Sequence, residues 1–315
     1  MATRNRFPVD RGLTARMLTT VFFLGLLYAL FVTVLWEVHV ALGFILVIAI
    51  GLLFVQYFYS DKIAMYSMGG KIVTREQEPT LYGVVDRLVA LANMPHPRVA
   101  IARSDIPNAF ATGRDQKHAV VCVTDGLLRR LDEQELEAVL AHELSHVAHR
   151  DVAVMTIASF LGILAGLMTR MLAYAGLFGG FGGGGRGRGG NNNNGGGQIV
   201  LVEMAMLLVS AIIYAISFIL IRTLSRYREL AADRSGAILI GQPALLARAL
   251  QKVSGDISRI PTRDLRAAQH FNAFYFAPAL APGSSISTLF STHPSLEVRL
   301  EQLAKLDAQM RAGTH

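Results

Sequence analysis

Cysteine and charge are both scarce in this chain. The single cysteine, Cys122, excludes an intramolecular disulfide and a zinc cluster built from cysteines. Its apolar surroundings, "AVVCVTDGL", are typical of a small core residue. Only 17% of the 315 residues are charged, whereas 52% are hydrophobic and the mean hydropathy is +0.40. A water-soluble domain of this length does not need so many apolar side chains, so we expect many of them to face lipid.

Four hydrophobic segments are long enough to cross the hydrocarbon core of a bilayer, which is ~30 Å thick. The first two, residues 17–36 and 41–59, carry no charge, and the other two, residues 152–178 and 199–221, carry one charge each. The first segment is too long for a cleaved signal peptide and is followed directly by the second. We therefore predict four membrane spans, the first of which is retained.

Basic residues predict the orientation of these spans. Four arginines against one aspartate precede the first span, whereas the loop "EVH" after it has no lysine or arginine. The positive-inside rule therefore places the N-terminus in the cytoplasm, and counting crossings places residues 60–151 and the chain after Arg222 there too. The net charge of +7 is then explained by topology and by attraction to anionic lipid. Without a nucleic-acid-binding signature, we expect the bilayer as a partner and no nucleic acid.

The spans divide the chain into four parts. Residues 1–60 hold an N-terminal cytoplasmic segment and the first transmembrane hairpin, and residues 152–221 hold the second hairpin with a Gly/Asn-rich external loop. Residues 61–151 and 222–315 are two parts of one cytoplasmic domain. Within residues 98–124, the stretches "RVAIA", "NAFATG" and "HAVVCVT" predict strands of a small sheet. We therefore predict a polytopic membrane protein that is mainly α-helical with a small β-sheet.

The stretch from residue 133 to residue 149 is predicted to be a helix. Asp132 can cap its N-terminus, with Glu135 completing a capping box. An amphipathic helix is also indicated by apolar residues at helical spacing, namely Leu136, Val139, Leu140 and Val147.

This helix carries the motif HExxH. His142 and His146 are one turn apart, so both rings project from nearly the same face and can bind one ion at ~2.0 to 2.1 Å. Glu143 is rotated by about 100° from His142 and lies beside the ion, where a base can take a proton from an attacking water. HExxH also occurs by chance, but the capped amphipathic helix favours a metal site over a solvated histidine pair.

A catalytic zinc needs a third protein ligand and an open position. His149 lies too close to His146 for the longer three-histidine pattern. The stretch "SRYRELAADRSG" offers Glu229 and Asp233 on one face of a helix, although such acidic pairs are also common on solvated helices. Beside HExxH, we predict that Glu229 completes a site for one zinc ion per chain and that Asp233 orients a ligand histidine. Two histidines and a carboxylate favour zinc over other divalent ions.

These motifs, together with "NAFATG", "STHPSLEVR" and the order of the hydrophobic segments, resemble the HtpX-type membrane zinc metalloproteases, heat-shock-associated relatives of the CAAX-prenyl endopeptidases. The likeness covers nearly the whole chain. It implies a gluzincin-like protease domain on the cytoplasmic side of a bacterial inner membrane, with Glu143 as the catalytic base. The implied substrates are misfolded or surplus membrane proteins, in membrane quality control and the stress response. A prenyl-protein peptidase would need a larger membrane chamber than these spans build.

Further site residues follow from the chemistry that a zinc peptidase requires. An edge strand with open backbone groups would hold substrate as an added strand, or would be an ordinary edge strand; its residues are Asn108, Ala109, Phe110 and Ala111. His293 is our hypothesis for the catalytic residue that stabilises the oxyanion, with a turn before Pro294 as the alternative role. Arg299 is expected to pair with an active-site acid such as Asp233.

Two other functions stay open at this point. A catalytically silent membrane scaffold or chaperone could keep zinc for stability, but Glu143 argues against it because structural zinc needs no base. A channel or transporter needs polar groups at mid-membrane or broken helices, of which the four segments show almost none. The sequence gives no indication of the oligomeric state.

Overall fold

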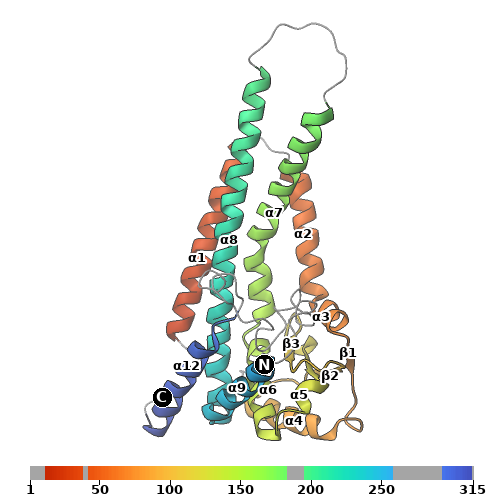
Figure 1. Cartoon of the computed structure of the whole chain (residues 1–315), viewed down its shortest axis with the longest axis vertical. Coiled ribbons are helices and arrows are strands. Elements are labelled where there is room, and N and C mark those ends of the chain that lie inside the picture. The colour runs from red at the N-terminus through yellow and green to blue at the C-terminus, as the bar shows by residue number, and fades with distance from the viewer. Residues whose placement is uncertain (1–10, 38–41, 183–194, 258–292, 314–315) are drawn as a thin grey trace. The chain divides into compact units, whose positions relative to one another are not determined.

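The structure is a computed structural model that describes residues 11–37, 42–182, 195–257 and 293–313 (Figure 1). The chain divides into two compact units. Residues 20–54 and 156–221 form the first, which we call the helical unit. The second, which we call the site unit, contains the described residues of 1–19, 55–155 and 222–315.

The hydrophobic segments fold as helices α1 (Arg11–Glu37), α2 (Leu42–Phe58), α7 (Asp151–Gly182) and α8 (Gly195–Ile240). Within the helical unit they share one apolar core, to which every one of them contributes: Phe31, Ala49, Leu164, Ala165 and Ile213. Large apolar side chains on their outer surfaces are exposed, as expected for helices surrounded by lipid.

The number of membrane spans depends on how bent helices are counted. In the described residues, two helical stretches are long and apolar enough to cross a bilayer, one in α1 and one in α8. The count rises to four if α2 with α3 (Ser60–Met68) and α6 (Glu133–Ala148) with α7 are each taken as one bent span. The apolar stretch of α8 is followed by charged residues from Arg222 onward, and the residues after 221 belong to the site unit.

The glycine-rich segment is partly helical. The Gly/Asn-rich loop of the second hairpin was predicted to occupy the residues between the third and fourth hydrophobic segments, 179–198, but α7 continues to Gly182 and α8 already begins at Gly195. Glycine is less favourable than alanine in a helix by about 1 kcal/mol, but extending an existing helix avoids the cost of nucleating a new one. Residues 183–194 of the predicted loop lie outside the described residues.

A four-stranded sheet lies in the site unit, with the order β1-β2-β4-β3. Its strands are β1 (Gly70–Ile72), β2 (Arg98–Ala102), β3 (Ala109–Thr112) and β4 (Val120–Thr124). β2 and β4 are parallel, and the outer strands run antiparallel to their neighbours. β3 is therefore an edge strand. The sequence predicted β2, β3 and β4 but missed β1, which is too short to show an alternating pattern.

The two faces of the sheet pack against different helices. Alternation along β2 and β4 directs Ala100 and Cys122 toward α3, where they join Ala64 in one apolar cluster. Val99 and Val121 point to the other face and join the main core, which includes α4 (Pro79–Ala92) and α6. Burial raises the pKa of the Cys122 thiol to about 12, consistent with the predicted core residue.

Helix α4 buries one apolar face against the core of the site unit. Its apolar residues recur at helical spacing, and Leu81, Val84, Val85 and Leu88 are buried, whereas Leu91 is 44% exposed and Ala92 is buried instead. Ala92 lies four residues after Leu88 and so continues its face, whereas Leu91 is rotated away. The remaining elements are η1 (Gln116–His118), α5 (Asp125–Leu128), α9 (Pro243–Ile257) and α12 (Leu296–Arg311); α9 packs against both α6 and α12.

Candidate metal centre and active site

The HExxH helix, α6, is fixed at its N-terminus by the predicted capping box. The Asp132 carboxylate accepts a hydrogen bond from Glu135 N at 2.8 Å, and Glu135 Oε2 accepts one from Asp132 N at 3.1 Å. The helix then enters the core, so that His142 is only 1% and Glu143 only 5% exposed. Polar groups buried to this degree need partners, and three other segments supply them.

Helix α8 crosses α6 at very short range. A Cβ placed on Gly236 would lie 2.7 Å from the backbone nitrogen of His142, so only glycine fits there. Gly236 shares a helical face with Glu229 and Asp233, because the three are spaced by four and three residues. The absence of a side chain on Gly236 permits this close approach. Its spacing from Glu229 was the signal that could have identified it.

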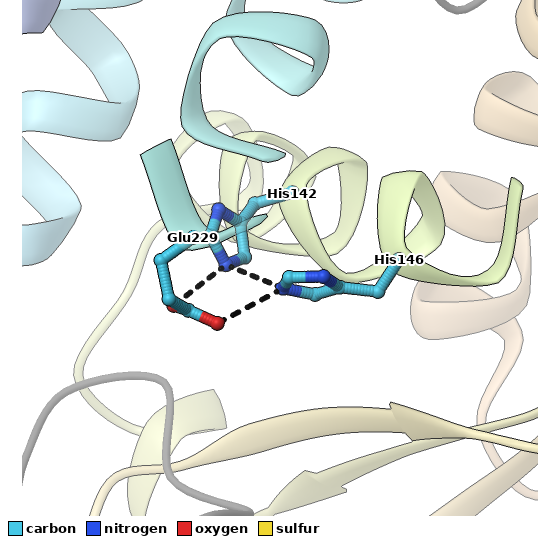
Figure 2. A group of neighbouring side chains, drawn as sticks. All are labelled: His142, His146 and Glu229. Carbon is cyan, nitrogen blue, oxygen red and sulfur yellow. Dashed lines mark hydrogen bonds and ion pairs between the residues drawn. The ribbon is translucent and has the colours of Figure 1, made fainter. Parts of the chain in front are cut away.

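Three side chains that could hold a metal ion meet at this crossing: His142, His146 and Glu229, whose ligand atoms all lie within 4.8 Å of one another. Figure 2 shows them pointing toward one another from α6 and α8. His146 Nε2 lies 3.2 Å from His142 Nε2 and 3.4 Å from Glu229 Oε1, and His142 Nε2 lies 3.7 Å from Glu229 Oε2. Tetrahedral zinc with bonds of ~2.0 to 2.1 Å spaces its ligands roughly 3.3 Å apart. The donors therefore fit zinc in both kind and spacing.

The first ligand histidine is oriented from behind by a buried ion pair. His142 Nδ1 lies 2.9 Å from Asp233 Oδ1, which leaves Nε2 for the metal. Arg299 donates two hydrogen bonds of 2.7 Å to the same carboxylate, and both side chains are almost fully buried. Removing one partner of such a pair costs ~3–5 kcal/mol, because the other charge is left uncompensated.

The second ligand histidine has a partner that the sequence analysis missed. His146 Nδ1 lies 2.5 Å from Asp151 Oδ2, and Arg228 donates to the same oxygen at 2.6 Å. Burial alone lowers the pKa of His146, but the Asp151 and Glu229 carboxylates outweigh it and raise this pKa to about 10. The available signal was an aspartate five residues after HExxH, with an arginine directly before Glu229.

Glu143 lies beside the three donors and faces the edge strand. Burial raises the pKa of its carboxyl group to about 8. Its Oε2 accepts a hydrogen bond from Ala111 N at 3.0 Å, so the carboxylate and the sheet edge are in direct contact. A cation held by the neighbouring donors would favour the ionised carboxylate.

The four predicted strand residues play different parts in the geometry. Thr124 N donates to Asn108 O, and because the pairs of an antiparallel ladder alternate, Phe110 also pairs with β4. Ala109 and Ala111 therefore direct their backbone groups away from β4, toward the open edge. The Phe110 side chain is buried with α3 on the opposite face of the sheet. Among the four, only the two alanines present an open edge to the site.

His293 joins the site from the segment before α12. It is 6% exposed, and its Nδ1 lies 3.0 Å from Glu229 Oε2. It therefore contacts the carboxylate that could ligate the metal. His149, in contrast, caps the C-terminus of α6 and is not among the three clustered donors.

Comparison with known proteins agrees with a zinc peptidase site. Residues 75–307 match the sequence profile of Peptidase family M48. The chain is 54% identical over 308 residues to the "Protease HtpX homolog 1" of Streptomyces coelicolor, covering 98% of this chain and 97% of that protein. It is 50% identical to the "Protease HtpX homolog" of Moorella thermoacetica and 47% identical to the "Protease HtpX homolog 2" of Methanosarcina mazei, with 98% of this chain and 98% and 99% of those proteins covered.

Among solved structures, the crystal structure of Ste24p from S. mikatae is similar in fold, with a TM-score of 0.50 at 16% sequence identity. The similarity covers 93% of this chain and 66% of that chain. At this identity it supports the fold alone: mainly helical, with a small sheet and candidate membrane helices.

Proposed function

Because this chain belongs to Peptidase family M48 and is a zinc metallopeptidase homologous to HtpX proteases, we propose that it cuts misfolded or surplus membrane proteins on the cytoplasmic side of a bacterial inner membrane. The observation that carries the proposal is that zinc donors, a buried carboxylate and an open strand edge meet in one unit. The arginines that follow the hydrophobic stretch of α8 support a cytoplasmic site.

His142, His146 and Glu229 would hold the zinc ion, which would supply Lewis-acid chemistry for the scissile carbonyl and the attacking water. Asp233 and Asp151 hold the two histidines with Nε2 toward the ion. The proton that the water loses goes to the Glu143 carboxylate, which then passes it to the nitrogen of the leaving amine.

A substrate binds in extended form along β3. The N–H and C=O groups of Ala109 and Ala111 face the open edge and can pair with its backbone. Glu143 accepts from Ala111 N in this structure, so a substrate strand approaches the base directly. Because backbone groups make these bonds, recognition depends more on an extended conformation than on particular side chains.

His293 remains our hypothesis for the residue that stabilises the oxyanion. Its contact with Glu229 at 3.0 Å supports a place at the site, and it equally fits a residue that positions Glu229. His293→Ala separates the two roles. Loss of turnover with unchanged zinc content supports the oxyanion role. Loss of zinc supports the role of positioning Glu229. Unchanged turnover in the zinc-loaded variant contradicts both roles.

The proposal is tested by the cleavage of casein, as an unfolded model substrate, by detergent-purified full chain. Wild type is compared with Glu143→Gln and with Glu137→Gln, a matched change on the outer side of the same helix, where Glu137 pairs with Arg87. Zinc content is measured for all three. We expect one zinc in each, with cleavage lost only in Glu143→Gln.

The other outcomes contradict the proposal in different ways. If none of the three proteins cuts while all hold zinc, the alternative of a zinc-stabilised membrane scaffold replaces it. If Glu143→Gln cuts as well as wild type, Glu143 is not the base.

A further inference from the structure

The short helix α3 exposes an apolar and aromatic face. Tyr59 and Ile63 are each 44% exposed and Tyr66 is 91% exposed. Tyr59 directly precedes the helix, and the three are spaced by four and three residues, so they lie along one side of it. Three large exposed side chains on one side of a helix of nine residues and the residue before it form a patch that needs an explanation.

The opposite side of α3 is firmly packed. Ala64 is fully buried against the sheet, with Met65 and Met68 beside it. A Cβ on Gly70 would lie 2.7 Å from Met65 Cε, which shows how closely the layers fit. Arg98 of β2 donates to Asp61 at 2.6 Å. The exposed face therefore belongs to a helix that is held in place by the sheet.

Aromatic rings and cations lie around this face. Tyr57, Phe58 and Tyr59 are consecutive, and the Tyr57 hydroxyl donates to Arg114 O at 3.3 Å. The Arg114 guanidinium carbon is 5.6 Å from the Phe58 ring centre, and Lys62 Nζ is 5.2 Å from that of Tyr59. Tyrosines mark the headgroup level of a bilayer, and lysine and arginine at that level attract anionic lipids.

The position of α3 directly after α2 indicates that lipid covers this exposed face. α3 follows α2, which holds the second hydrophobic segment, after a bend of 68°. A helix that bends by 68° away from a membrane span can run along the membrane surface, and an amphipathic helix there buries its apolar side at the boundary of headgroups and acyl chains.

We propose that α3 is an interfacial anchor. Tyr59, Ile63 and Tyr66 insert into the headgroup region of the leaflet at which α2 ends, and Lys62 and Arg114 contact anionic headgroups. The inference rests on α2, with 17 residues, crossing the membrane by itself and not as one bent span with α3, and it does not rest on the proteolytic activity. Since the other side of α3 carries the sheet, the anchor holds β3 and its open edge at a fixed distance from the bilayer surface.

The test uses the full chain in bilayers of phosphatidylethanolamine and phosphatidylglycerol. In a Cys122→Ala background, Ile63→Cys and Tyr66→Cys are spin-labelled, and collision rates with oxygen, which enters lipid, and with a water-soluble nickel chelate are measured. Leu91→Cys is the matched control, because Leu91 has the same exposure as Ile63 but lies on α4, which covers the other face of the sheet. We expect an oxygen-to-nickel ratio several-fold higher at both α3 positions than at the control.

Equal ratios at the three positions would overturn the proposal. So would strong dipolar broadening between labels, which indicates that a second copy of the chain covers α3. If Cys122→Ala does not fold, Tyr66→Trp in a Trp36→Phe background gives the same test through quenching by brominated lipid. Quenching no stronger than for Leu91→Trp then contradicts the anchor.

Discussion

At the scale of single residues, the two ligand histidines are held by two different carboxylates. Asp233 was predicted to orient a ligand histidine, whereas Asp151 was not identified from the sequence. We expect Asp151→Asn to weaken zinc binding by about 10–100-fold, the usual cost of losing a partner that orients a metal ligand. Competition with a chromogenic chelator measures this.

A matched change provides the control for that variant. Asp105→Asn removes a carboxylate that is 94% exposed and pairs with Arg129, so zinc affinity should stay at the wild-type value. If Asp151→Asn binds zinc as tightly as this control, the contact between Asp151 and His146 does not orient the ligand.

The proton on His146 makes zinc binding depend on pH. Its carboxylate neighbours raise the pKa of this histidine to about 10, so at neutral pH the metal-free side chain is protonated, and a protonated nitrogen cannot ligate. Zinc must displace that proton, and affinity should therefore fall as pH falls, by about tenfold per unit for one proton released. Calorimetry in buffers of different ionisation enthalpy counts the protons; release of none contradicts the prediction.

At the scale of helices, the crossing of α6 and α8 depends on Gly236. In Gly236→Ala the new Cβ meets the His142 backbone at 2.7 Å, so α8 must move and Glu229 with it. We expect a loss of about 1–3 kcal/mol of unfolding free energy from overpacking, together with weaker zinc binding.

Gly255→Ala is the control for this substitution. A Cβ there meets nothing within 4 Å, and alanine at this exposed position of α9 should raise the unfolding free energy by about 0.5–1 kcal/mol. Denaturation measures the unfolding free energy of both variants, and zinc titration measures their zinc affinity. Unchanged zinc affinity in Gly236→Ala would show that α8 reaches the ligand position by another packing.

The anchor proposed for α3 has a functional consequence at the same scale. Ile63→Asp combined with Tyr66→Asp should lower cleavage of a substrate tethered to the bilayer by a short linker, because the sheet edge is no longer held near the surface. Casein cleavage in solution should not change. Leu91→Asp is the control, and an equal loss on both substrates would indicate damage to the site instead.

The sequence alone predicted those elements and site residues that are marked by a local pattern or a fixed spacing. The capping box, the HExxH helix and three strands follow from local patterns, and Glu229 was identified because a catalytic zinc requires a third ligand. Gly236 and Asp151 were missed because their roles arise only where two helices cross or meet. The helical ends of the glycine-rich segment were missed because composition describes a segment and not the helices that extend into it.

At the scale of the whole molecule, zinc joins two distant parts of the chain. His142 and His146 belong to residues 55–155, whereas Glu229 belongs to the residues after 221. A ligand that binds only the folded state stabilises it, so removing zinc with a chelator should lower the melting temperature of the purified protein. Glu229→Gln should melt at a lower temperature and respond much less to the chelator; an identical response in both contradicts this role of the metal.

The hydrogen bond from Ala111 N to Glu143 has a consequence for proteins that should not be cut. In this structure the Glu143 carboxylate accepts the hydrogen bond of Ala111 N, which is a group that an incoming substrate strand would use. A polypeptide must therefore compete with Glu143 for Ala111 N before it reaches the metal site. Folded proteins have already paired their strands and offer no such competitor. Under the proposed function, this competition would spare intact neighbours in the membrane and select chains that have lost their own strand partners.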